Sequence, residues 1–190
     1  VWALLVEAQR QAVARTGRPM ALPWVPPGLW AAWAEEANRP VVDLLFEAFF
    51  ADAPWDGALE REALAVVNRH RADHGLPPVR LDRHAVLAAR AHAIYDVLHG
   101  KRHGHRQVPG TLGFVGERPS DRARALGARQ AYLGENLHGI TGPAPVVQGF
   151  MDSPPHRANL LMEGSELVIG YAEATAGRYR CAALPIGLIP

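Results

Sequence analysis

The sequence predicts an α+β fold, because helical patterns come first along the main part of the chain and strand patterns come last. Apolar residues recur at helical spacing between residues 58 and 99, whereas two short apolar runs near the carboxyl end, Leu167–Ala174 and Arg178–Leu184, are separated by a turn. The chain has 190 residues, of which 48% are hydrophobic and 21% are charged. This composition is typical of a globular protein and excludes a disordered or collagen-like chain.

Two long helices are expected at the start of this region. The first covers Leu59–His74 and ends at Gly75, which a pair of prolines follows closely. Asp82 is predicted to cap the second helix, which runs to about His99. The side chains expected to face inward from the second helix are Leu87, Ala91, Ile94, Tyr95 and Leu98.

The remaining elements are shorter. The segment Gly100–Pro119 is rich in glycine and histidine, and a loop of this length is usually functional or disordered. The elements predicted after it are a short helix from Ser120 to about Gly127, a strand over Leu133–Ile140, a helix over Pro143–Met151 and a β-hairpin of the two apolar runs.

The first 57 residues differ in composition from the rest. All five tryptophans lie within the first 55 residues, so we predict a Trp-rich helical extension over residues 1–57 and a second domain over residues 58–190. One interpretation is that the extension packs on the main domain. The other is that it contacts a partner or a component of the cell envelope, since tryptophan suits interfaces as well as cores.

Charge does not indicate a nucleic-acid partner. The 20 Lys and Arg residues nearly balance the 19 Asp and Glu residues, and the basic stretch 58–130 contains only Tyr95 and Phe114 as aromatic residues. A solvated arginine-rich surface is therefore favoured over nucleic-acid binding. The sequence has no run of about 18 apolar residues that would predict a transmembrane segment, and no complete signal peptide is recognised. Cys181 is the single cysteine, which excludes an intrachain disulfide.

The signatures of several common enzyme classes are missing. The sequence has no Gly-x-x-x-x-Gly-Lys-Ser/Thr loop, no Gly-x-Gly-x-x-Gly, no His-Glu-x-x-His and no Gly-x-Ser-x-Gly. Nucleotide binding, zincin-type proteolysis and α/β-hydrolase chemistry therefore lack their usual motifs.

Histidine is frequent, with nine residues in the chain. His99, His103 and His105 lie in the predicted loop, and His138 and His156 follow farther along. Imidazole both binds zinc and transfers protons near neutral pH. Taken singly, each histidine is better explained as a surface or hydrogen-bonded residue, so a site requires that several of them converge in space.

Four motifs occur in order along the chain. They are the segment from Asn68 to His92 with Asn68-Arg69-His70-Arg71 at its start, Gly134-Glu135-Asn136-Leu137, Ser153-Pro154-Pro155-His156-Arg157-Ala158-Asn159 and Ile169-Gly170-Tyr171-Ala172. Together they resemble the CAP superfamily, which comprises the cysteine-rich secretory, antigen 5 and pathogenesis-related-1 proteins, in its bacterial secreted form with an SCP domain. The resemblance extends from about Ala58 to Leu184.

The resemblance implies a three-layer α-β-α sandwich with an antiparallel central sheet, in a protein that is secreted or associated with the cell envelope. It also implies an open cleft in which zinc or another divalent cation is held by His105 (or His103), Glu135 and His156. Two imidazoles and one carboxylate would leave an open coordination position, as in a catalytic or exchangeable site.

The resemblance also gives roles to neighbouring residues. Asn136 and Ser153 are expected to support the cleft residues by hydrogen bonds. The family's second glutamate, on the helix before His156, is missing here, and Asp152 would replace it only if its side chain turned inward. Phe150 stands where the family commonly has tryptophan.

Three functional hypotheses follow, and the sequence leaves open whether the protein is an enzyme. The first is an exported binding domain whose cleft accepts a divalent metal and a small lipid, glycan or peptide ligand. The second is a metal-dependent, peptidase-like hydrolase with a metal on His105 and His156 and with Glu135 as base, although Glu135 cannot easily be both ligand and base. The third is a structural or adhesive cell-envelope module that uses the Trp-rich segment.

Overall fold

The structure is a computed structural model that describes residues 10–11, 13–17, 55–100, 104–111, 113–129, 131–164, 166–176 and 178–188. His103 and most of the predicted Trp-rich extension lie outside the described residues. Within the extension, residues 13–16 are helical, and Arg15 donates a hydrogen bond to the carbonyl of Val97 at 3.2 Å.

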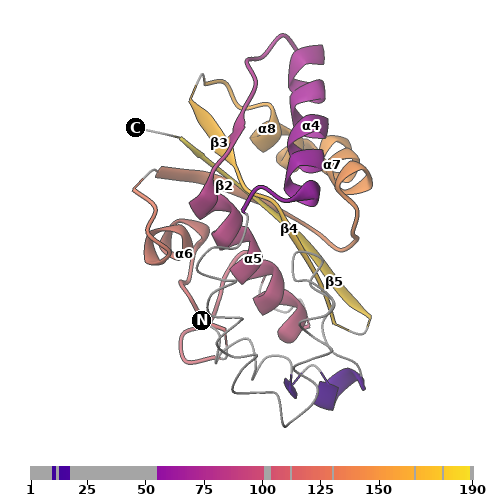
Figure 1. The fold of residues 1–190 in the computed structure, drawn as a ribbon, viewed down its shortest axis with the longest axis vertical. Helices are drawn as coiled ribbons and strands as arrows, with labels where there is room; N and C mark the ends of the chain where they lie inside the picture. Colours follow the sequence, from indigo (N-terminus) through magenta and orange to yellow (C-terminus); the bar gives the residue numbers. More distant parts are fainter. Residues whose placement is uncertain are drawn as a thin grey trace.

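Helices cover both faces of a five-stranded sheet (Figure 1). The labelled elements are α4 (Ala58–Asp73), β1 (Arg80–Leu81), α5 (Arg83–Leu98), α6 (Pro119–Ala125), β2 (Ala131–His138), α7 (Pro143–Asp152), α8 (Pro154–Leu160), β3 (Leu167–Ile169), β4 (Ala172–Ala176) and β5 (Tyr179–Leu188). The strand order is β1-β3-β5-β2, and β4 pairs with the other half of β5. The predicted α+β class and three-layer arrangement are confirmed, but the sheet is not strictly antiparallel, because β1 and β3 run parallel.

The second long helix, α5, begins as predicted, and Tyr95 and Leu98 are buried as expected, but the rest of its buried face differs from the prediction. The Asp82 side chain accepts a hydrogen bond from the backbone N–H of Ala85 at 2.8 Å, which caps the helix. Leu87, Ala91 and Ile94, which were expected inward, are only half-buried. The fully buried positions are instead mostly small, and they include Ala85, Ala88, Ala89 and Ala93.

Small residues on both sides explain why α5 lies so close to the sheet. Gly170 joins β3 to β4 directly beneath the first turn of α5, and a Cβ atom at Gly170 would collide with the backbone of Ala85 and Val86. Glycine is therefore required by this close approach. It also separates the predicted run Leu167–Ala174 into two strands.

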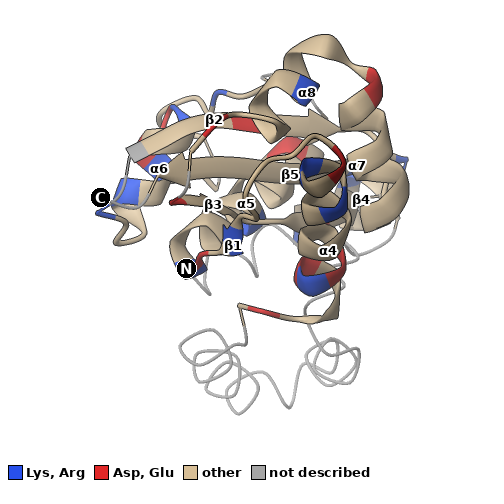
Figure 2. Ribbon diagram, turned by 90° about the horizontal axis from the view of Figure 1, so that it is seen from above, with Lys and Arg blue, Asp and Glu red and all other residues tan. Residues whose placement is uncertain are grey.

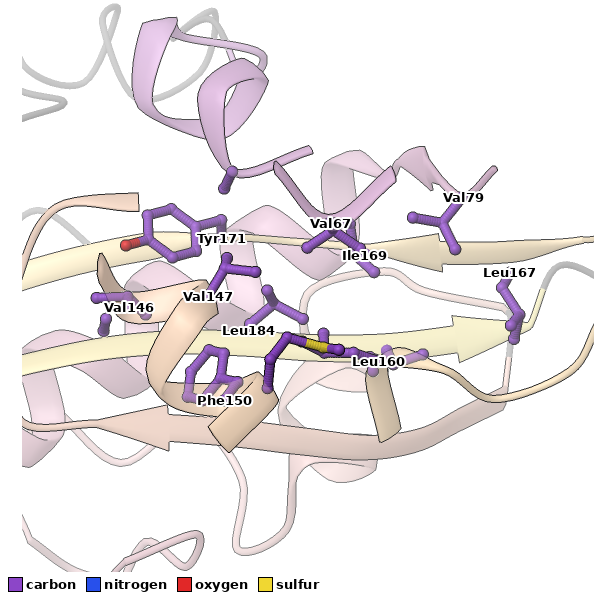
Figure 3. Close-up of a cluster of buried hydrophobic side chains, with 14 residues drawn as sticks. Val67, Val79, Val146, Val147, Phe150, Leu160, Leu167, Ile169, Tyr171 and Leu184 are labelled. Atoms are coloured by element: carbon purple, nitrogen blue, oxygen red, sulfur yellow. The ribbon is translucent and has the colours of Figure 1, made fainter. Parts of the chain in front are cut away.

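The larger hydrophobic core lies on the opposite face of the sheet, under α4, α7 and α8. Figure 3 shows Val67 of α4, Val147 and Phe150 of α7, and Leu184 of β5 pointing into one cluster. Burying four such side chains stabilises the fold by roughly 1.5–3 kcal/mol each. No helix in the described part of the chain is long and apolar enough to span a membrane.

Candidate functional site

Two of the predicted site residues, Glu135 and Asn136, lie next to each other on strand β2, and their side chains face different layers of helices. This strand lies at the end of the sheet order, beside β5 (Figure 2). The register shifts between Tyr132 and Gly134, which leaves Leu133 as a bulged residue. Beyond the bulge successive side chains alternate, so Glu135 and Asn136 point to opposite faces of the sheet.

Glu135 is the centre of a buried polar cluster on the side of α5 and α6. Nη2 of Arg122 donates to both carboxylate oxygens, at 2.8 and 2.9 Å. Nδ1 of His105 lies 3.1 Å from Oε2, and Nε2 of His92 lies 3.7 Å from the same oxygen. The side chains of Glu135, Arg122 and His92 are excluded from solvent, whereas that of His105 is 49% exposed.

These contacts determine protonation states. Burial acts to raise the pKa of Glu135, but His92, His105 and Arg122 together hold it below its ordinary value. Because the carboxylate is an acceptor, Nδ1 of His105 carries the proton. The other ring nitrogen of His105, Nε2, therefore lies on the side away from Glu135.

His92 forms hydrogen bonds with the loop that contains His105. Nε2 of His92 donates to the carbonyl of Gly104 at 2.8 Å, so its Nδ1 is the acceptor for Nε2 of Gln107 at 3.4 Å. Oε1 of Gln107 in turn accepts from the backbone N–H of Val115 at 2.8 Å. Burial is the main cause that lowers the pKa of His92 to about 4, so this histidine is neutral at physiological pH.

Arg122 joins the same loop to α6. Its Nη1 donates to the carbonyls of His105 at 3.1 Å and Glu117 at 3.3 Å. No role was predicted for Arg122 or His92 from the sequence. His92 belongs to a quoted motif on a predicted helix, which is a signal that could have found it, whereas nothing in the sequence distinguishes Arg122 from the other basic residues.

His156 approaches from the opposite layer. Nδ2 of Asn136 donates to the carbonyl of His156 at 2.9 Å, and Nδ2 of Asn159 donates to Oδ1 of Asn136 at 2.8 Å. The ring of His156 lies edge-on to Phe150, with 5.4 Å between centroids. Burial, His105 and His138 lower the pKa of His156, so His156 and His105 lie within electrostatic range of each other.

Two further cleft candidates, Asp152 and Ser153, lie where α7 ends and α8 begins. Asp152 is exposed, and its Oδ1 accepts from Nε2 of Gln148 at 2.8 Å, so its side chain is not turned inward. Ser153 lies between α7 and α8, and its hydroxyl makes no capping hydrogen bond to α8. Its carbonyl accepts from the backbone N–H of Arg157 at 2.8 Å.

The divalent cation that the resemblance implies does not fit these residues. Both oxygens of Glu135 already accept hydrogen bonds from the guanidinium of Arg122, so a metal ion would lie next to a buried positive charge. In the described part of the chain, no group of three or more His, Cys, Asp or Glu side chains could hold a metal ion. Of the predicted ligands His105, Glu135 and His156, the structure brings only the first two into contact.

A shallow pocket opens beside His105. It has a volume of about 250 Å³. One wall consists of His105 and Arg106 from the loop, and another consists of Tyr132, Leu133 and Gly134 from β2. The first turn of α6 and the residue before it complete the pocket with Arg118, Pro119 and Ser120.

The chain belongs to the CAP family. The profile of this family, described as the cysteine-rich secretory protein family, matches residues 64–183, and the fold described above has the expected layers. A search among curated proteins found no match.

Two solved structures have a similar fold. An outer surface protein from Borrelia burgdorferi is 18% identical, with a TM-score of 0.54 over 67% of this chain and 90% of that one. An extracellular protein with an SCP domain from Bacillus anthracis is also 18% identical, with a TM-score of 0.50 over 66% of this chain and 39% of that one. At this identity the likeness extends to the fold alone.

Proposed function

We propose that this CAP domain is an exported binding module whose ligand occupies the pocket beside His105. The observation that carries the proposal is the state of Glu135, which is buried and bonded through both oxygens to Arg122. A general base must reach a proton of the substrate, and a metal ligand needs a free lone pair directed at the ion. A carboxylate that is excluded from solvent against a guanidinium meets neither requirement, so Glu135 acts by orienting His105.

Export is part of the proposal. One structural neighbour is named as an outer surface protein and the other as an extracellular protein, and family membership supports the same compartment.

Zinc titration by isothermal calorimetry tests the role of Glu135. We expect no stoichiometric zinc site, and the heats of the wild type and of Glu135→Gln should be the same. A single zinc site that disappears in Glu135→Gln would overturn the proposal and restore the metal hypothesis.

A thermal-shift experiment tests the pocket. The probes are a chitooligosaccharide, palmitate and a short acidic peptide, each added to the full chain. We expect at least one probe to raise the melting temperature of the wild type, and this gain should be lost in His105→Ala but kept in His74→Ala. His74 is an exposed histidine at the end of α4 and serves as the matched control. If no probe requires His105, the pocket is not the binding site.

A further inference from the structure

The pocket beside His105 is lined by basic and not by acidic side chains. His105, Arg106 and Arg118 contribute to its walls, and none of the residues that line it is an Asp or Glu. Opposite charges attract across a partly desolvated pocket more strongly than in water. The pocket is therefore suited to a ligand that carries a negative group.

The surrounding charges are largely paired with one another. Among the described residues, Arg106 pairs with Glu117 at 2.7 Å, Arg124 pairs with Asp121 at 3.5 Å, and Arg122 pairs with the buried Glu135. Figure 2 shows segments of both colours around α6. Arg118 forms no ion pair in the described part of the chain, and it is one of the residues that line the pocket.

The other half of the pocket is apolar and lies along an edge strand. β2 pairs with β5, and the described residues contain no strand on its other side. The bulged residue Leu133 is 46% exposed there, next to Tyr132 and Pro119. An unpaired strand edge presents backbone N–H and C=O groups that an extended peptide can bond.

The size of the pocket limits what enters it. Its 250 Å³ is below the range of about 300–1,000 Å³ that is typical of sites for drug-sized ligands. One side chain with its carboxylate fits this volume, and the rest of a longer ligand would have to lie outside it. The edge of β2 provides such an extension for a polypeptide, because only a peptide backbone matches the hydrogen bonds of a strand.

We infer that the pocket and the adjoining edge of β2 bind an extended peptide that carries a carboxylate, with the carboxylate at Arg118 and His105 and an apolar side chain against Leu133. This inference rests on the proposed function and names the class of ligand for the same pocket. Palmitate and oligosaccharides lack a backbone that pairs with a strand, so they are alternative outcomes of the test.

Fluorescence anisotropy with two matched peptides tests the inference on the full chain. The first is a fluorescein-labelled Thr-Val-Thr-Leu-Asp with a free carboxyl end, and the second has Asn in place of Asp and an amidated end. We expect the acidic peptide to bind about tenfold more tightly, and this preference should decrease as salt is added. Equal binding of the two peptides would overturn the assignment of a carboxylate.

Two variants locate the binding site. Arg118→Glu should weaken binding of the acidic peptide about tenfold, because it replaces attraction by repulsion. Arg124→Glu makes the same change in net charge on the same helix, away from the residues that line the pocket, and should leave the affinity within about twofold. Equal losses in the two variants would show a general effect of charge and overturn the proposed site. Thermal melting of each variant confirms that it is folded.

Hydrogen exchange tests the pairing with β2. The bound acidic peptide should slow exchange of backbone amides in residues 131–138, whereas 10 mM acetate alone should not. Unchanged exchange in β2, or complete displacement of the peptide by acetate, would overturn the strand-edge part of the inference.

If the acidic peptide does not bind but a glycan or palmitate still stabilises the protein through His105, the inference is wrong and the proposed function stands. If no probe requires His105, both are wrong.

Discussion

Glu135 and Glu173 are both buried carboxylates on the same sheet, but their surroundings differ in charge. Glu135 on β2 accepts two hydrogen bonds from Arg122 and lies beside His92 and His105. Glu173 on β4 accepts a hydrogen bond from the backbone N–H of Gly142 at 2.7 Å and another from the hydroxyl of Tyr171. Neither of its two partners carries a positive charge.

The pKa values of the two groups shift in opposite directions. Burial raises the pKa of Glu173, and the negative charges of Glu62 and Glu60 raise it further, against the effect of its two hydrogen bonds. Burial also acts to raise the pKa of Glu135, but the neighbouring histidines and Arg122 reverse the result. Burial alone therefore does not determine whether a carboxyl group is charged, because the charges and hydrogen-bond donors around it can reverse the effect of burial on its pKa.

The largest effect on this difference between Glu135 and Glu173 is expected when the guanidinium of Arg122 is removed. Arg122→Met leaves the Glu135 carboxylate buried without its main partner, so we expect the free energy of unfolding at pH 7 to fall by about 3–5 kcal/mol. Urea denaturation measures this change. Arg124→Met is the matched control, because its side chain is 75% exposed on the same helix, and its effect should stay within about 0.5 kcal/mol.

A double variant separates the lost ion pair from the lost packing. If Glu135→Leu is combined with Arg122→Met, no buried charge remains unpaired, and the loss should be smaller than the sum of the two single losses. A loss below about 1 kcal/mol in Arg122→Met alone would show that the pair is not part of the folded core.

Lowering the pH should decrease the free energy of unfolding because of His92, which is buried beside Glu135. The pKa of His92 is about 4 in the folded protein against 6.5 ordinarily, so the unfolded chain binds the proton more readily. The stability contributed by neutral His92 is therefore present above pH 6.5 and is lost as the pH falls toward 4, by up to about 3 kcal/mol. Urea denaturation between pH 4 and 7 should show this slope in the wild type, and His92→Gln should have a shallower one. Parallel slopes in the two proteins would contradict the assignment.

The smallest change in stability is expected for a substitution of Glu173. Its raised pKa means that the stability it contributes is present below its ordinary pKa of 4.5 and is lost as the pH rises through the folded value. Glu173→Gln keeps an oxygen for Gly142 and Tyr171 but cannot ionise, so its stability at pH 4 should lie within about 1 kcal/mol of the wild type. Relative to the wild type, the variant should gain stability between pH 4 and 8. A relative loss over this range would mean that Glu173 is held as a charged group.

Much of the fold was predictable from local patterns. Asp82 caps α5 as expected, the helix predicted over Pro143–Met151 is α7, and the hairpin predicted near the carboxyl end is formed by β4 and β5. These features depend on spacing and on turn chemistry within a few residues. The inward face of α5 was predicted correctly for Tyr95 and Leu98 but not for Leu87 and Ile94, because close contact with Gly170 selects small residues near the start of the helix.

The candidate site was predicted less completely. The pairing of His105 with Glu135 agrees with the resemblance, but the resemblance did not indicate that Arg122 would bind both oxygens of Glu135. His156 was expected beside Glu135, and the alternation of side chains along β2 instead brings the backbone of His156 to Asn136 on the other face.

The sequence alone determines the order of the helices and strands, the cap of α5 and the four family motifs, because each depends on residues close together in the chain. The tertiary structure decided the chemical state of the Glu135 carboxylate. Arg122, His92 and His105 lie between 13 and 43 positions from it along the chain, and only the packing of α5 and α6 against β2 brings their charges and hydrogen bonds into contact. Electrostatic interactions depend on distance in space and on burial, and neither can be obtained from separation in sequence.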